Sequence, residues 1–128
     1  MKNDVRFFRC IHCGNLVLLL HAGGAPLFCC GEPMQELIPN TAEASVEKHL
    51  PSVHVSGGTV SVSVGEPHHP MTEEHGIQWV YLLTTKGGQL FQFTAGERPE
   101  AEFSLAGGDF PLAAYAYCNL HGLWKTVL

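Results

Sequence analysis

The chain has 128 residues, of which 45% are hydrophobic and 15% are charged. This length allows one ordinary globular domain, or one domain of about 90 residues with a small appendage. The formal net charge of −5 argues against nucleic acid as a partner, because nucleic-acid-binding proteins present a basic face.

The charge is unevenly distributed along the chain. Residues 1–40 contain three basic and three acidic side chains, whereas residues 41–128 contain four basic and nine acidic side chains. The second part would therefore repel an anionic substrate as a whole. A site for such a substrate would need local positive charge.

The amino terminus and the cysteine count indicate the compartment. The first residues show no signal-peptide pattern, and the longest aliphatic run, residues 16–20, is far too short to cross a bilayer. Five cysteines are an odd number, which fits a disulfide framework poorly. We therefore expect a cytoplasmic protein without membrane contact, whose thiols bind metal.

Residues 1–38 form the first predicted domain, a cysteine module. Short strands are predicted at residues 5–8 and 16–20, on either side of a turn that carries Cys10 and Cys13. The adjacent pair Cys29 and Cys30 follows a second turn. A module of this size buries too little surface to fold alone, so metal or dimerisation must hold it together.

The second predicted domain, residues 39–128, begins with a linker and shows a period of two, with no convincing helical period. Val60, Val62 and Val64 alternate with serines. Further strands are predicted at residues 77–85, 89–94, 103–105, 112–118 and 123–127, separated by glycine and proline turns. Six or seven such strands predict an all-β fold, an immunoglobulin-like β-sandwich or a related barrel.

Four cysteines form the first candidate metal site. Cys10 and Cys13 make a C-x2-C knuckle, followed by Gly14. Cys29 and Cys30 can bind the same metal only if the backbone turns sharply between them. From the spacing alone, tetrahedral zinc and tetrahedral iron fit equally well, and a purely structural zinc knuckle is the simplest alternative.

Histidines around a fifth cysteine form the second candidate site. The motifs are Glu47-Lys48-His49-Leu50-Pro51, His69-Pro70-Met71-Thr72-Glu73-Glu74-His75 and Cys118-Asn119-Leu120-His121-Gly122. Four imidazoles and one thiolate would leave one free position on an octahedral metal, where a substrate can bind. His68 remains an alternative to His69. We take the other histidines, His12, His21 and His54, as ordinary residues, and the aromatic residues Trp79, Trp124, Tyr115 and Tyr117 as core.

Together these motifs resemble desulfoferrodoxin, the two-iron form of superoxide reductase, over nearly the whole chain. The resemblance implies an immunoglobulin-like seven-stranded sandwich behind a small desulforedoxin-like domain, usually in a homodimer. It implies one iron on the four cysteines, Cys10, Cys13, Cys29 and Cys30. It implies a catalytic iron with four equatorial imidazoles and an axial thiolate, from His49, His69, His75, His121 and Cys118.

The resemblance also assigns a reaction and two further residues. Superoxide would take one electron and two protons to become hydrogen peroxide, without release of dioxygen, and rubredoxin is the implied electron donor. Glu47 would occupy the open iron position in the oxidised state, and Lys48 would supply positive charge and help to deliver a proton. Gly76 departs from the family pattern, in which a larger, often aromatic residue follows His75.

The main rival hypothesis is a non-catalytic electron carrier or metal-binding module. Its histidine site would be closed or filled by zinc. The colour and metal content of the purified protein separate the two hypotheses, because a colourless zinc protein would favour the rival.

Overall fold

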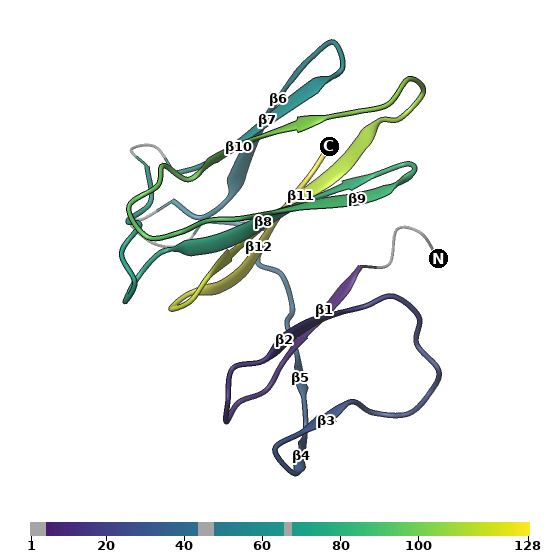
Figure 1. Cartoon of the computed structure of the whole chain (residues 1–128), viewed down its shortest axis with the longest axis vertical. Coiled ribbons are helices and arrows are strands. Elements are labelled where there is room, and N and C mark those ends of the chain that lie inside the picture. The colour runs from purple at the N-terminus through teal and green to yellow at the C-terminus, as the bar shows by residue number, and fades with distance from the viewer. Residues whose placement is uncertain (1–4, 44–47, 66–67) are drawn as a thin grey trace. The chain divides into compact units, whose positions relative to one another are not determined.

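The computed structural model describes residues 5–43, 48–65 and 68–128, and the chain divides into two compact units, Met1–Ile38 and Pro39–Leu128. All regular elements of the described residues are strands, and none of these residues forms a helix long and apolar enough to cross a membrane. The strands are labelled in Figure 1. The fold is therefore all-β, as the sequence predicts.

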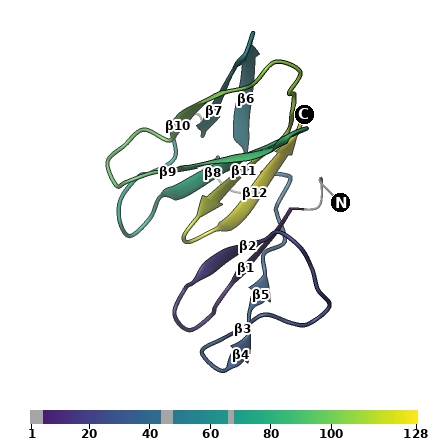
Figure 2. The same ribbon diagram turned by 45° about the vertical axis from the view of Figure 1, so that its right-hand side comes forward.

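The first unit is built from very short strands. Its three-stranded sheet has the order β2-β1-β5, and a two-stranded ribbon pairs β3 with β4, all antiparallel (Figure 2). The strands are β1 (Arg6–Arg9), β2 (Leu16–Leu19), β3 (Phe28–Cys29), β4 (Glu32–Pro33) and β5 (Gln35–Glu36). Among the described residues of this unit, only Phe7 and Cys10 are fully buried.

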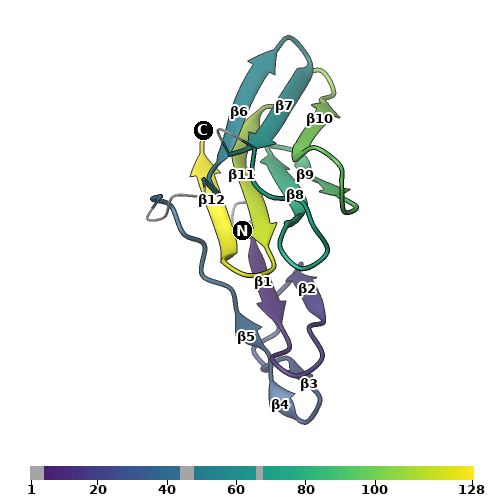
Figure 3. The same cartoon turned by 90° about the vertical axis from the view of Figure 1, so that its left-hand side faces the viewer.

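The second unit consists of two antiparallel sheets with seven strands. The first sheet has the order β10-β7-β6 and the second the order β12-β11-β8-β9 (Figure 3). The strands are β6 (Pro51–Ser56), β7 (Thr59–Val64), β8 (Ile77–Thr84), β9 (Gly87–Gln92), β10 (Glu100–Ser104), β11 (Pro111–Cys118) and β12 (Gly122–Val127). This is the β-sandwich-like architecture that the sequence predicts.

The core of the sandwich combines alternate residues of both sheets. On β7 the three valines that alternate with serines are fully buried and face the apolar residues of β8 and β11. The buried cluster is Val60, Val62, Val64, Ile77, Val80, Leu82, Ala101, Phe103, Ala114, Ala116 and Cys118. Cys118 therefore belongs both to this core and to the second candidate metal site.

One strand of the sandwich was missed by the sequence analysis. β6 pairs with β7 from Pro51↔Val64 to Ser56↔Thr59, but most of its side chains are exposed or half-buried. An edge strand with little burial carries a weak apolar alternation, so periodicity does not reveal it. Its position matters, because His49 lies two residues before it.

Candidate metal centres

The four cysteines of the first unit come from two connections between strands. Cys10 and Cys13 lie between β1 and β2, Cys29 ends β3, and Cys30 lies in the turn to β4. Cys10 is buried, whereas Cys13 and Cys30 are exposed. One sulfur from each of these residues lies within 4.8 Å of the others.

The spacing of these sulfurs fits a tetrahedral metal. Metal–sulfur bonds of about 2.3 Å place the sulfurs of a tetrahedral site about 3.8 Å apart. The Sγ atoms of Cys13 and Cys29 are 3.6 Å apart, and those of Cys29 and Cys30 are 3.9 Å apart. The sharp turn that adjacent ligands require is present, because Cys30 has a left-handed φ of 54°. That conformation costs roughly 1–2 kcal/mol for a residue with a side chain, which metal binding can offset.

The thiols of this module differ strongly in acidity. The backbone N–H of Cys13 donates to the Cys10 sulfur at 3.5 Å and is the main reason that the pKa of Cys10 falls to about 6. Hydrogen bonding with the Cys13 and Cys10 sulfurs raises the pKa of Cys30 to about 12. One thiolate therefore exists near neutral pH before metal arrives, and further thiol protons must leave when a metal binds.

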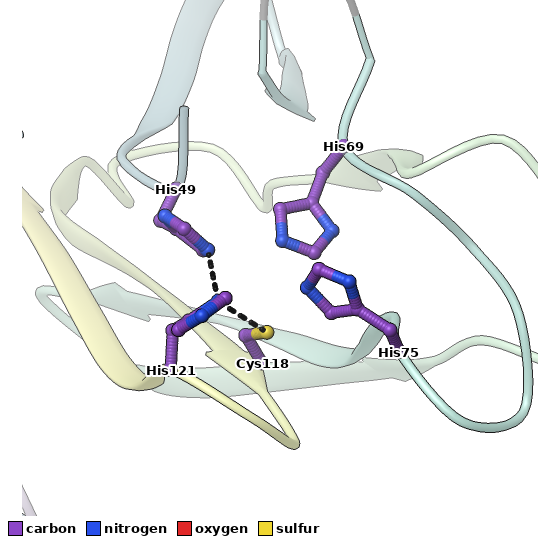
Figure 4. A group of neighbouring side chains, drawn as sticks. All are labelled: His49, His69, His75, Cys118 and His121. Carbon is purple, nitrogen blue, oxygen red and sulfur yellow. Dashed lines mark hydrogen bonds between the residues drawn. The ribbon is translucent and has the colours of Figure 1, made fainter. Parts of the chain in front are cut away.

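The five donors of the second site are brought together by the sandwich. His49 precedes β6, His69 and His75 lie in the connection from β7 to β8, Cys118 ends β11, and His121 lies in the turn to β12. One donor atom from each residue lies within 4.8 Å of the others. Segments more than 70 residues apart in sequence thus meet at one point (Figure 4).

The four imidazoles form a closed ring of neighbours, each steeply inclined to the next (Figure 4). Ring centroids are 4.6 Å apart for His49 and His69, and 4.8 Å apart for His69 and His75. They are 5.1 Å apart for His75 and His121, and 4.9 Å apart for His121 and His49. Each imidazole thus has two others as neighbours, and the four rings could hold one metal between them.

Hydrogen-bond geometry identifies the ring atoms that face the centre. Nε2 of His49 lies 3.1 Å from Nδ1 of His121, close to the ~3 Å between neighbouring imidazole ligands with metal–nitrogen bonds of about 2.1 Å. Nδ1 of His69 lies 2.8 Å from the Pro70 carbonyl oxygen. A carbonyl can only accept, so Nδ1 carries the proton and Nε2 of His69 is the nitrogen with a lone pair for a metal.

Cys118 supplies the sulfur of this cluster. Its Sγ lies 3.8 Å from Nδ1 of His121, and the side chain is fully buried. The pairing of β11 with β8 shifts register between Tyr117 and Cys118, an irregularity that is frequent beside functional sites because it re-aims a side chain. The donor set of four imidazoles and one thiolate fits iron, because imidazole is one of its usual ligands and thiolates bind it in iron–sulfur clusters.

Two supporting residues were not assigned a role from the sequence. Trp124 stacks on His49 with centroids 4.6 Å apart, and its Nε1 donates to the carbonyl of His121 at 3.1 Å. Glu43 accepts hydrogen bonds from the backbone N–H groups of His49 and Leu50, and its Oε2 lies 3.9 Å from Nδ1 of His49. An acidic residue six positions before a ligand forms no recognisable motif, so only the structure reveals Glu43.

The remaining histidines lie outside both clusters. His12, His21 and His54 are exposed, as expected of ordinary residues. His68 is also exposed, and its Nε2 lies 2.9 Å from Glu100, whereas the adjacent His69 is buried in the cluster. The two residues proposed for catalysis differ in what can be described: Lys48 is exposed beside buried His49, and Glu47 lies outside the described residues.

Gly76 is enclosed by the loop that carries His75. A Cβ atom on Gly76 would lie 2.9 Å from the Thr72 carbonyl oxygen and 3.3 Å from Cα of Met71. The larger residue that the family pattern predicts at this position would therefore require this loop to shift. The glycine is needed for close approach of the backbone, and its φ is not left-handed.

Comparison with known proteins finds relatives of both units. Residues 41–127 match the desulfoferrodoxin family, and residues 2–37 match the desulfoferrodoxin N-terminal domain. A desulfoferrodoxin from Nitratidesulfovibrio vulgaris is 42% identical over 126 residues, which cover 98% of each chain. A superoxide reductase from Pyrococcus horikoshii is 36% identical over 62% of this chain and 84% of its own length.

Solved structures of superoxide reductases are also similar to this chain. The crystal structure of the superoxide reductase from Treponema pallidum has a TM-score of 0.85 at 37% identity, covering 96% of this chain and 98% of its own. The superoxide reductase (1Fe-SOR) from Giardia intestinalis has a TM-score of 0.54 at 32% identity, covering 64% of this chain and 97% of its own. With one cluster of four cysteines and another of four histidines and a cysteine, the chain belongs to the desulfoferrodoxin family of superoxide reductases.

Proposed function

We propose that this protein reduces superoxide to hydrogen peroxide at an iron held by His49, His69, His75, His121 and Cys118. The observation that carries the proposal is the convergence of four imidazoles and one thiolate within 4.8 Å, in a chain that belongs to this family. Iron in such a site would supply the one electron that superoxide accepts, and two protons would complete hydrogen peroxide.

The protein side chains determine what that iron experiences. Cys118 would bind as a thiolate, and its burial at the end of β11 keeps the sulfur away from oxidants in solution. Trp124 covers one face of His49 and restricts rotation of that ring. A site prepared in this way needs little rearrangement when the charge at its centre changes.

Lys48 is proposed to attract the substrate. Superoxide is an anion, and residues 41–128 carry nine acidic and four basic side chains. Lys48 is exposed and directly precedes a ligand, and we expect its ammonium group to concentrate an anion near the site and to donate a proton. Glu47 is proposed as the carboxylate that occupies the open position in the oxidised state.

The cysteines Cys10, Cys13, Cys29 and Cys30 are proposed to hold a second iron that relays electrons. We propose that residues 1–38 and 39–128 act as separate domains, because neither cluster includes a residue from the other unit. The Giardia protein supports this division, since nearly its whole length aligns with 64% of this chain. We expect catalysis to persist without the first iron.

Three features of the cellular context are also proposed. A homodimer would cover apolar side chains that the small module exposes, among them Leu20, Phe28 and Ile38, which are 91%, 62% and 75% exposed. A small electron carrier of the rubredoxin type would reduce the protein. The five cysteines, all within the described part of the chain, form no disulfide, which supports a reducing cytoplasm as its location.

The test combines metal content, visible spectra and kinetics of the purified protein. We expect two irons per chain, a sulfur-to-iron charge-transfer band for each site, and rapid consumption of superoxide by the reduced protein without dioxygen production. Zinc at the histidine site, or dioxygen release in the amount expected of dismutation, would contradict the proposal. Zinc in both sites would favour the non-catalytic module.

A further inference from the structure

The backbone on either side of His75 is held from two directions. Thr72 holds His75 itself: its Oγ1 accepts from the His75 N–H at 3.0 Å and donates to the His75 carbonyl at 3.1 Å. Asn119 holds the neighbouring peptide groups. Its Nδ2 donates to the Glu74 carbonyl at 2.8 Å, and its Oδ1 accepts from the Gly76 N–H at 3.0 Å.

These two sets of contacts have different consequences. Thr72 lies in the same loop as His75, so its bonds shape the loop without fixing the position of the loop. Asn119 directly follows Cys118, and its backbone N–H also donates to the Gly76 carbonyl at 3.3 Å. The Asn119 contacts therefore join the segment that carries His75 to the segment that carries Cys118 and His121.

We propose that Asn119 is a positioning residue that fixes His75 relative to Cys118 and His121. The inference rests on the proposed function, because these three residues matter together only if they bind one metal. Without the side-chain clamp, the pairing of Ile77 with Cys118 and the backbone bond from Asn119 to Gly76 would still join the segments, but only after His75 in the chain. The peptide group before His75 would then be held by its own loop, and loops are the more mobile parts of a fold. Outer residues that orient metal ligands typically contribute 10–100-fold to metal affinity.

The amide of Asn119 is suited to this task and a carboxylate is not. One side of the group must donate to Glu74 and the other must accept from Gly76, which an amide does simultaneously. Asn119→Asp keeps the size and the acceptor but turns a second acceptor toward the Glu74 carbonyl. The variant thus removes the hydrogen bond to Glu74 while it keeps the packing of the side chain.

Gln89 provides a matched control on the same sandwich. Its Nε2 donates to the Ser104 carbonyl at 2.9 Å, a side-chain amide bond between segments that carry no metal ligand. Gln89→Glu removes the same kind of donor and adds the same charge. Effects that both variants share are effects on the sandwich, and effects unique to Asn119→Asp belong to the metal site.

The experiment measures iron retention against a ferrous chelator, the position of the charge-transfer band of the oxidised histidine site, and thermal unfolding of the full iron-loaded chain. We expect Asn119→Asp and Asn119→Ala to weaken iron binding at the histidine site by about 10-fold or more and to shift its band. Iron on the four cysteines should be unaffected. Gln89→Glu should match the wild type in iron affinity and in band position.

Wild-type affinity and band position in Asn119→Asp would overturn the proposal, whatever the change in unfolding temperature. Failure of both Asn119 variants to fold would also overturn it, because the clamp would then support the sandwich rather than position a ligand. A wild-type chain without iron at the histidine site would instead refute the proposed function, and this inference with it. The wild-type spectrum therefore tests the proposed function. The ratio of iron affinity between variant and wild type tests the role of Asn119.

Discussion

The two metal centres of this chain are built in opposite ways. The cysteine cluster takes its four ligands from 21 consecutive residues of a module in which two of the described side chains, from residue 5 on, are fully buried. The histidine cluster takes five ligands from residues 49–121, on a sandwich with an apolar core of its own. In the first unit the metal helps to form the fold, whereas in the second the fold forms the metal site.

The local backbone of each region fits this contrast. Cys30 adopts a left-handed conformation in the two-residue turn between β3 and β4, where Gly31 also has a positive φ, and this tight hairpin brings the adjacent thiols into one cluster. The histidine ligands are instead fixed by neighbours that do not bind metal, including Trp124, Glu43 and Asn119. Five changes test this difference, in order of decreasing expected effect.

Cys118→Ser should have the largest effect on catalysis. It removes the sulfur of the histidine site, so the visible band of that site should disappear. The rate of superoxide reduction should fall by more than the roughly 100-fold that changes beyond the ligands cost at metal sites. Pulse radiolysis and absorption spectra measure both effects. An unchanged band would mean that Cys118 is only a core thiol.

Cys13→Ser should have a large effect confined to the first unit. With three thiols left, the module should lose or alter its iron and unfold, since it has almost no core. The histidine-site spectrum and the rate of superoxide reduction should stay near wild type. Loss of both metals with collapse of the sandwich would show that the two units are not independent.

Lys48→Ala should slow the encounter with superoxide by roughly 10-fold, because it removes the steering charge beside the site. The rate should also depend less on salt, since screening acts on that attraction. Lys86→Ala is the matched control. It removes the same charge at the far end of β8, eight residues or roughly 26 Å from the loop of His75. Equal rates for both variants at two ionic strengths would exclude steering by Lys48.

Gly76→Ala should lower the free energy of unfolding of the sandwich by about 1–3 kcal/mol, as expected when an added carbon meets a closed backbone. The added Cβ would lie 2.9 Å from the Thr72 carbonyl oxygen. Gly107→Ala is the control, because a Cβ there meets nothing within 4 Å and its φ is not left-handed. Denaturant unfolding followed by tryptophan fluorescence compares the two variants, and equal stabilities would show that the loop yields without cost.

Asp109→Asn should have the smallest effect, a loss of stability near neutral pH that shrinks as the pH falls. Desolvation raises the pKa of Asp109, but hydrogen bonds from Thr85, Thr84 and the Lys86 and Phe110 N–H groups outweigh it, so the pKa lies below its ordinary value of 3.8. The stabilisation is therefore complete above that value and is lost as the pH falls through the lower folded pKa. Urea unfolding between pH 2 and 5, roughly the range in which a lowered carboxyl titrates, should show a weaker acid sensitivity in the variant.

Sequence reasoning was most successful where a pattern is local. The alternation of valines predicts the buried face of β7, and the fold class follows from several strands of this kind. It was least successful at β6, whose exposed side chains carry little periodicity. The same limit applies to Glu43, because a contact six residues away depends on how the chain turns.

The sequence alone determined the chemistry of this protein: which side chains can bind metal, and which family carries them in these motifs. Only the tertiary structure decided which atoms meet. It placed His69 rather than His68 in the cluster, turned Nε2 of His49 and Nδ1 of His121 to the same centre, and joined the segments of Cys118 and His75 through Asn119. The physical reason is distance along the chain, since contacts between segments this far apart are set by strand pairing and core packing, which local patterns do not encode.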